Sequence, residues 1–322
     1  MPFYACRKEG VVSLKRVNLV LTMLGISILF FFSCYAPSYA EHSSKYNRDS
    51  APAPVIQLAE HTINELSQNS EFASFHNSSL HIMPLGPGTH RFLVHVLQGK
   101  DVAGYLIITA EQSPIDETDT QQMKYLVTEY GVGTSSVFDP ELLYLLGHRS
   151  EQEKGTEDST PYEMKYTGIL SYWVIKNTEK TIYVDATNGD VLLDNPEVLT
   201  EPLTQDGSPD RISTSHTLKT IHKTSPLFDS SENIKWRVST PISLRSELTL
   251  LKKLDTSKQL IFSSSEHNMW YSGPLSISGY ATWTSPETGN VSYARLGIDQ
   301  SQVRYIPVKR LLGSGDFYES TK

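Results

Sequence analysis

Apolar and polar residues follow several distinct patterns along the chain. After a polar stretch that ends in Ala-Pro-Ala-Pro at residue 54, apolar residues recur at the spacing of one helix face over residues 55–66. Residues 79–83 alternate weakly between apolar and polar, and residues 91–97 and 102–110 are two apolar runs that flank the turn sequence Gln-Gly-Lys-Asp. These patterns predict a helix, a first strand and then a β-hairpin.

The next part of the chain predicts two helices and a second hairpin. Residues 121–130 are expected to be helical, and residues 139–147 predict a short helix with an Asp N-cap, a Pro in its first turn and a closing Gly. Residues 169–175 and 181–186 are two apolar segments that predict a hairpin. The dipeptide Asn188-Gly189 is the strongest short hairpin-turn signal in the sequence.

The last third of the chain has the pattern of a β protein. It follows a segment rich in Ser, Thr, Pro and Asp with few bulky apolar residues, which predicts a linker. Short strands separated by turn residues favour a small barrel or sandwich. The strands are expected at residues 235–238, 260–262, 269–271, 278–283, 291–296 and 302–308.

Together these patterns predict the α+β class, with an N-terminal helix packed on an antiparallel sheet and a small all-β domain after it. Residues 1–40 are expected to be a signal peptide and residues 41–54 an extended stalk. The α+β domain is expected at 55–196, the linker at 197–231 and the β domain at 232–322.

The predicted signal peptide has three recognisable parts. Four basic residues precede the uncharged, mostly apolar run 19–32, which is shorter than the roughly 20 residues of a membrane-spanning helix. Ser38 and Ala40 are small residues at the −3 and −1 positions, so cleavage is predicted after Ala40. An uncleaved anchor and lipidation at Cys34 are the alternatives. All three place the bulk of the chain outside the cytoplasm.

Charge and cysteine content narrow the classes of partner and site. Residues 41–322 contain 24 Lys and Arg against 35 Asp and Glu, a net charge of −11, which disfavours nucleic acid and anionic membrane surfaces as partners. The membrane contact expected is through the leader alone, if it stays uncleaved. Both cysteines, Cys6 and Cys34, precede the cleavage site, so no disulfide or Cys-ligated metal is expected after it. An exported protein of this size without disulfides favours a bacterial source.

Residues 182–192, Ile-Tyr-Val-Asp-Ala-Thr-Asn-Gly-Asp-Val-Leu, resemble the closing hairpin of PepSY-type domains. These domains occur in peptidase propeptides and exported bacterial proteins, and consist of a helix on an antiparallel sheet. The family's Asp and Gly correspond to Asp185 and Gly189, which are expected to shape the turn. The helix at 55–66 lies farther upstream of Asp185 than in that family, so an insertion or two related units are both compatible with the sequence.

Two shorter stretches resemble other exported modules. Residues 94–96 and 104–108 resemble strand pairs in the propeptides of secreted cysteine peptidases. Residues 235–246 and 304–312 resemble the first and last strands of bacterial Src-homology-like barrels, which bind cell-wall peptides. An unassigned β domain is the alternative for the C-terminal part.

No catalytic, metal or cofactor motif is evident. The ten histidines have no metal-ligand spacing, and no Gly-x-Ser-x-Gly sequence or phosphate-binding glycine loop is found. Asp116 and Asp119 lack the Gly and Glu of a calcium loop. No catalytic, cofactor-binding or metal residue is therefore assigned, although a dispersed Ser/His/Asp triad would leave no sequence motif.

Aromatic residues of the β domain are the candidate ligand contacts. At strand spacing they are expected mainly in the core, with part of the set lining a groove for sugar or peptide. The groove candidates are Trp270, Tyr271, Tyr280 and Trp283, with Tyr293 beside them.

The leading hypothesis is an exported, non-enzymatic binding module that restrains a peptidase or binds peptide or cell-wall material. Strand addition at the edges of the hairpins 91–110 and 171–193 is the expected mechanism. The alternatives are an extracytoplasmic hydrolase with dispersed catalytic residues and an envelope structural protein held by its leader.

Overall fold

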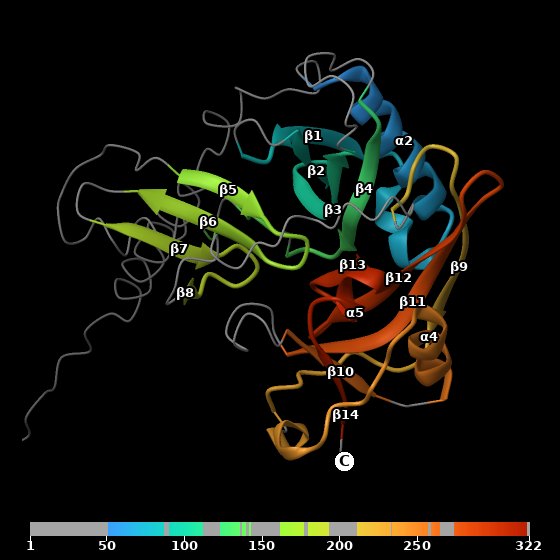
Figure 1. Cartoon of the computed structure of the whole chain (residues 1–322). Coiled ribbons are helices and arrows are strands. Elements are labelled where there is room, and N and C mark those ends of the chain that lie inside the picture. The colour runs from blue at the N-terminus through green and yellow to red at the C-terminus, as the bar shows by residue number, and fades with distance from the viewer. Residues whose placement is uncertain are drawn as a thin grey trace, which may run out of the picture. The chain divides into compact units, whose positions relative to one another are not determined.

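The fold belongs to the α+β class, with mostly antiparallel strands and few helices (Figure 1). It was obtained as a computed structural model. The structure describes residues 51–86, 90–111, 123–135, 137–139, 142, 162–176, 180–192, 211–232, 234–256, 259–264 and 274–320. The predicted signal peptide, most of the stalk, the helix at 139–147 apart from residues 139 and 142, and the strand at 269–271 lie outside these residues.

In the first half of the chain, the elements that the structure describes are an α-helix, a short 3₁₀ helix and eight strands. In chain order they are α2 (Ala53–Ser67), η3 (Ser70–Phe75), β1 (Ser79–Pro84), β2 (Arg91–Gln98), β3 (Asp101–Ala110), β4 (Tyr125–Val132), β5 (Tyr162–Tyr166), β6 (Ser171–Lys176), β7 (Thr181–Asp185) and β8 (Val191–Leu192).

The described part of the second half adds six strands, two α-helices and another 3₁₀ helix. They are β9 (Thr217–Lys223), η5 (Ile234–Val238), α4 (Glu247–Thr256), β10 (Leu260–Ser263), β11 (Leu275–Ser285), β12 (Gly289–Gly297), β13 (Val303–Pro307), α5 (Val308–Leu312) and β14 (Asp316–Glu319).

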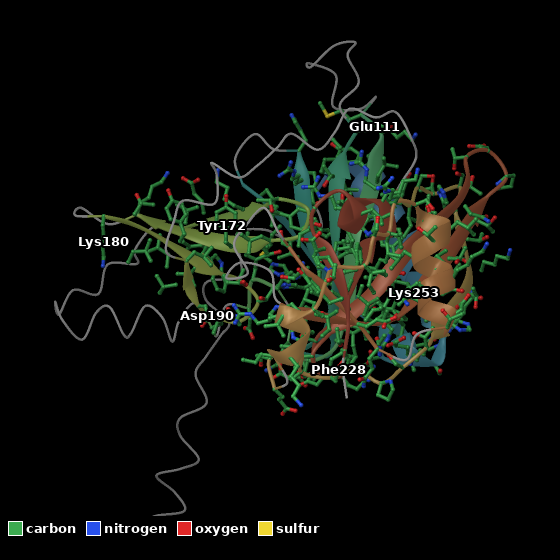
Figure 2. The ribbon with its side chains drawn as sticks, turned by 60° about the horizontal axis from the view of Figure 1, so that its bottom comes forward. Glu111, Tyr172, Lys180, Asp190, Phe228 and Lys253 are labelled. Atoms are coloured by element: carbon green, nitrogen blue, oxygen red, sulfur yellow. The ribbon has the colours of Figure 1, made fainter. Side chains whose placement is uncertain are left out.

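The strands form two antiparallel sheets. The large sheet has ten strands in the order β1-β2-β3-β4-β13-β12-β11-β10-β14, with β9 paired to β11 beside this path. The small sheet has the order β5-β6-β7-β8. Figure 2 shows the small sheet with Tyr172, Lys180 and Asp190 labelled.

The large sheet crosses the predicted domain boundary. β4 from the first half pairs with β13 from the second, with Val132 opposite Val303 and Tyr130 opposite Tyr305. All described residues lie within one compact unit, 46–322. The two-domain prediction is therefore replaced by one sheet shared between both halves of the chain, because strands 170 residues apart complete each other's hydrogen bonding.

The predicted linker 197–231 also contributes to this sheet. β9 lies within it and pairs with β11, and Ile212 forms an isolated bridge with Val127 of β4. This segment has few bulky apolar residues because β9 is largely exposed and buries little side-chain surface. This part of the linker prediction was wrong for the described residues 211–231.

Several predicted elements are confirmed and others are corrected. The helix at 55–66 corresponds to α2, the strand at 79–83 to β1, and both predicted hairpins are present as β2–β3 and β6–β7. The expected helix at 121–130 is wrong, since residues 125–132 form β4. All eight residues of β4 are buried, so apolar residues lie on both faces of the strand and the alternation of a half-exposed strand is absent.

In the second half, the strands predicted around 260–262, 278–283, 291–296 and 302–308 are confirmed as β10 to β13. The predicted strand 235–238 is instead the 3₁₀ helix η5, where Trp236 is the buried residue. α4 was not predicted. α4 buries Leu250 and Leu254, which form a narrow apolar stripe on one face of a short helix.

Of the four hydrophobic clusters among the described residues, two connect distant parts of the fold. The buried side of α2 shares one cluster with residues of β1 to β4 and of β11 to β13. A second cluster joins the sheets, because Trp173 and Val184 of the small sheet pack with Leu93, Tyr105 and Ile107 of the large one. The small sheet is thus held against the large sheet by apolar contacts.

Candidate functional site

The edges of the two sheets differ from those predicted. β2 is paired with both β1 and β3, and β3 with both β2 and β4, so the hairpin 91–110 has no open edge. β6 is likewise internal, between β5 and β7. The expected binding edge on the hairpin 91–110 is therefore wrong, whereas the segment 171–193 keeps an edge at β8. Among the described strands, the small sheet ends at β5 and β8.

β5 presents an open row of backbone groups. The Thr167 N–H donates to the Leu170 carbonyl over 2.9 Å, and antiparallel pairing repeats this contact at every second residue. Glu163 and Lys165 therefore face β6, while the backbone groups of Tyr162, Met164 and Tyr166 face away from the sheet. Within the described part of the chain, the outward N–H and C=O groups of Tyr162 and Met164 have no hydrogen-bond partner.

Other strand edges carry features that interrupt such a row. On β1, Pro84 occupies an outward position and lacks an N–H donor. On β9, the outward Leu218 N–H already donates to the Glu65 carboxylate over 3.0 Å. On β14, the Phe317 carbonyl accepts from the Ile242 N–H over 2.7 Å. β8 spans two residues. β5 is the edge best suited to accept another strand.

The side chains of β5 are buried at one end of the strand and exposed at the other. Tyr166 is buried and Met164 is partly buried against the cluster between the sheets. Tyr162, at the start of the strand, is 53% exposed although it is large and aromatic. On the opposite face, Glu163 pairs with Lys176 and Lys165. The edge thus presents open backbone groups beside an exposed aromatic ring.

A buried polar network fixes the position of β5. The Tyr166 hydroxyl donates to Glu129 Oε2 over 2.9 Å, and the Tyr105 hydroxyl donates to Glu129 Oε1 over 2.5 Å. Arg304 binds the same carboxylate and also donates from Nη2 to the Ile169 carbonyl over 2.5 Å. The network therefore ties β5 and the β5–β6 turn to β3, β4 and β13.

The charges in this network favour the protonation states that its hydrogen bonds require. Burial, and then the negative charge of Glu129, raise the pKa of Tyr105 and of Tyr166, so both phenols remain protonated donors. Burial alone would lower the pKa of Arg304, but the Glu129 carboxylate outweighs it and raises this pKa. A charged carboxylate with these donors is fully satisfied.

A second buried ion pair lies elsewhere in the large sheet. Arg295 of β12 donates from Nε to Glu71 Oε1 over 2.8 Å, and the Tyr305 hydroxyl donates to Glu71 Oε2 over 2.6 Å. Burial would raise the pKa of Glu71, but the hydrogen bond and charge of Arg295, with help from Tyr305 and Lys223, lower it. This pair joins η3 to the C-terminal strands.

Asp185 and Gly189 lie in the turn between β7 and β8. Asp185 Oδ1 accepts hydrogen bonds from the Thr187 N–H and hydroxyl, at 2.7 and 2.5 Å. Burial raises the pKa of Asp185. Gly189 has a positive φ of 81°, and its N–H donates to the Asp185 carbonyl. Both residues therefore have turn-forming contacts.

The predicted groove aromatics do not come together as a groove in the described residues. Trp283 is buried and its indole donates to the Tyr130 hydroxyl, and Tyr293 is buried with its hydroxyl donating to the Val127 carbonyl. Tyr280 stacks on His222. Trp270 and Tyr271 lie outside the described residues, as do Asp116 and Asp119.

Ser213 and His216 form a Ser–His contact that lacks the geometry of a hydrolytic triad. Ser213 Oγ lies 3.0 Å from His216 Nδ1, but this nitrogen also accepts the Ser213 backbone N–H over 3.1 Å. His216 Nε2 faces the Thr288 hydroxyl at 3.2 Å, where a triad would have a carboxylate. The contact therefore has the geometry of a local turn.

The other histidines that the structure describes do not assemble a metal centre. His81 and His95 lie opposite each other on β1 and β2, with ring centroids 6.4 Å apart. Burial lowers the pKa of His95 to about 4. In the parts of the chain that the structure describes, no group of three His, Cys, Asp or Glu residues is arranged to hold a metal.

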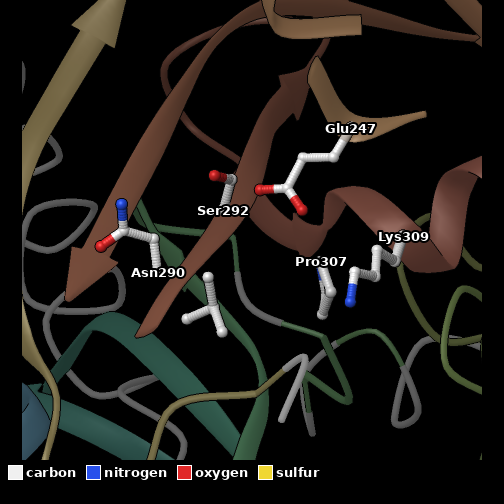
Figure 3. Close-up of a pocket in the computed structure, with 6 residues that line it drawn as sticks. Glu247, Asn290, Ser292, Pro307 and Lys309 are labelled. Atoms are coloured by element: carbon white, nitrogen blue, oxygen red, sulfur yellow. The ribbon is translucent and has the colours of Figure 1, made fainter. Parts of the chain in front are cut away.

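A small depression lies beside α4 and α5 (Figure 3). It encloses about 180 Å³, including the open space above it. Small-molecule sites usually occupy about 300–1,000 Å³. The depression is therefore too small for an ordinary ligand pocket. Its lining residues are Glu247, Asn290, Val291, Ser292, Pro307 and Lys309.

β5 is the functional element that was not predicted from the sequence. Tyr162, Met164 and Tyr166 alternate with Glu163 and Lys165, which is a period of two. This alternation is the signal that identifies the strand, although it spans five residues only.

None of the described helices is both long enough and apolar enough to cross a membrane. No family model, no curated protein and no solved structure matches the chain.

Proposed function

We propose that this protein is an exported, non-enzymatic module that binds an extended peptide segment as an additional strand on β5. The open N–H and C=O groups of Tyr162 and Met164 are the observation that carries the proposal. An added strand would satisfy these groups, and main-chain hydrogen bonds of this kind provide affinity in other strand-addition complexes. The ligand would come from a peptidase, a free peptide or cell-wall material.

The resemblance to PepSY-type domains agrees with this function. In our proposal, α2, the antiparallel strands and the closing hairpin at 182–192 correspond to a helix-on-sheet module enlarged by additional strands. Such modules occur with peptidases, so a peptidase segment is the partner class we favour. Export through the leader at 1–40, with cleavage after Ala40, would bring the protein to such a partner.

Selection from a random peptide library displayed on phage tests the proposal. The purified protein should enrich extended, apolar-containing peptides, and Met164→Pro should abolish binding because it removes an outward donor. Tyr162→Pro, at the exposed start of the strand, is a second variant less disruptive to folding. Leu80→Pro on β1 is the matched control, since it removes an outward donor from another edge.

Far-ultraviolet circular dichroism would verify that each variant is folded. Equal peptide binding by the wild type, Met164→Pro and Tyr162→Pro would refute β5 as the binding edge. Failure of the wild type to enrich any peptide would refute the peptide-binding function itself.

A further inference from the structure

Two arginines meet at the end of the β5 edge. Arg91 of β2 donates from Nη1 to the Tyr166 carbonyl over 2.6 Å, and Arg310 of α5 donates from Nη2 to the Thr167 carbonyl over 2.7 Å. These carbonyls belong to adjacent residues, so both guanidinium groups bind the same turn. We call Arg91 and Arg310 the arginine pair.

Gly168 allows the close approach of this pair to the turn. Its φ is +98°, and a Cβ at this position would lie 2.8 Å from Arg310 Nε. Any other residue would be strained in its backbone and would push against the guanidinium group. The turn is therefore shaped to let Arg310 lie directly against it.

The arginine pair has no compensating carboxylate among the described residues. This contrasts with Arg304 and Arg295, which bind Glu129 and Glu71. The Nε atoms of Arg91 and Arg310 are both buried without a hydrogen-bond partner. Both side chains are only partly buried, so their positive charge is uncompensated within the described residues and remains open to a ligand.

A third arginine adds to the local positive charge. Burial lowers the pKa of Arg91, and the charges of Arg211 and Arg310 lower it further, while Tyr166 and Tyr172 act in the opposite direction. The side chains of all three are partly buried. Guanidinium groups bind carboxylates through their N–H donors, and here the donors that a carboxylate can reach are the Nη groups not bound to the turn, because both Nε atoms are enclosed by the protein. A carboxylate at this point would relieve the repulsion between the arginines.

We propose that the arginine pair binds a carboxylate of the peptide that adds to β5, which makes the preferred ligand an acidic peptide. The inference rests on the proposed function. Since the pair binds at Tyr166 and Thr167, the carboxylate lies at the Tyr166 end of the edge. It is either an Asp or Glu side chain or the C-terminus of a strand parallel to β5.

Peptides selected with the wild type provide the first test. Their sequences should share an acidic residue or a free C-terminus at one fixed position. Replacing that carboxylate by an amide should weaken binding to the wild type at least tenfold, but should have little effect on the Arg91→Gln/Arg310→Gln variant. Lys309→Gln, which removes one positive charge from the same helix, should behave like the wild type.

The result that would overturn the inference is an amide substitution that weakens binding equally in the wild type and the double variant. Selected peptides without a shared carboxylate would overturn it as well, while the strand-addition function would stand. Loss of all peptide binding in Met164→Pro, together with weakened but measurable binding in the double variant, is the combination that supports the inference.

Inorganic phosphate alone gives a second test that does not depend on peptide binding. At equal ionic strength and pH, exchanging chloride for phosphate should raise the melting temperature of the wild type more than that of the double variant. An equal rise in both proteins would overturn the anion site, whatever the outcome of the peptide selection.

Discussion

The Arg304 guanidinium grips the Glu129 carboxylate with two hydrogen bonds, Nε to Oε1 at 2.8 Å and Nη2 to Oε2 at 3.1 Å, and both side chains are almost completely buried. The pair connects β4 to β13, which are strands from opposite halves of the chain. It also binds the β5–β6 turn through the Ile169 carbonyl. The candidate edge is therefore positioned by a charge pair that the sequence divides by 175 residues.

Breaking this pair should be far more costly than replacing it. Glu129→Leu or Arg304→Met should each lower the free energy of unfolding by about 3–5 kcal/mol, because each leaves a buried polar partner uncompensated. The Glu129→Leu/Arg304→Met double variant should lose less than the sum of the single changes. Urea unfolding measures this, and additive losses would contradict the coupling.

Breaking the Glu71–Arg295 pair, which connects η3 to the C-terminal strands, should also destabilise the protein. Glu71→Gln should destabilise the protein by about 3 kcal/mol, because Arg295 stays buried and loses its counter-charge. Lys223→Gln is the control, since Lys223 is half exposed and its contact with Glu71 should contribute below about 1 kcal/mol. Similar losses in both variants, measured by urea unfolding, would refute the assignment.

The pattern of apolar and polar residues was sufficient to predict the elements formed by neighbouring parts of the sequence. The β2–β3 hairpin follows from two apolar runs around Gln98-Gly99-Lys100-Asp101, and Gly99 has a positive φ of 68°. α2 follows from its helical spacing. By contrast, β4 is buried on both faces, and a short apolar run of that kind is compatible with either a helix or a strand.

The shared sheet and the edge site could not be predicted in this way. The pairing of β4 with β13 depends on contacts that are distant in sequence, and no local signal reports them. One partial signal was present, because Glu129 and Arg304 are single charges inside otherwise apolar strands. The arginine pair gave no such signal, since Arg91 and Arg310 meet only after the turn at 167–170 is folded against β2 and α5.

Acidification should destabilise the protein through His95. Its pKa is about 4 in the folded state against an ordinary value of 6.5, so the unfolded chain binds more protons between these values. Stability should therefore be complete above pH 6.5 and fall by up to about 3 kcal/mol as the pH drops to 4. His95→Gln should reduce this dependence and His222→Gln, which is exposed, should leave it unchanged. Urea unfolding at a series of pH values measures this dependence. The same change in unfolding free energy with pH in His95→Gln as in the wild type would contradict the prediction.

Two glycines allow a comparison of turn strain with steric conflict. Gly189→Ala should lower stability by about 2 kcal/mol, because the backbone has a positive φ and the new Cβ would lie 2.9 Å from Leu142 Cδ1. Gly99→Ala, with a positive φ but no atom within 4 Å, should cost about 1 kcal/mol. Thermal unfolding would contradict the steric argument if the two variants lost equal stability.

Amide hydrogen exchange at single residues of β5 tests the central claim most directly. With a selected peptide bound, exchange at the outward amides of Tyr162, Met164 and Tyr166 should slow at least tenfold, while Glu163 and Lys165, whose amides already face β6, should change little. Slowing confined to β1 or β9, or slowing that does not alternate along β5, would contradict strand addition at this edge.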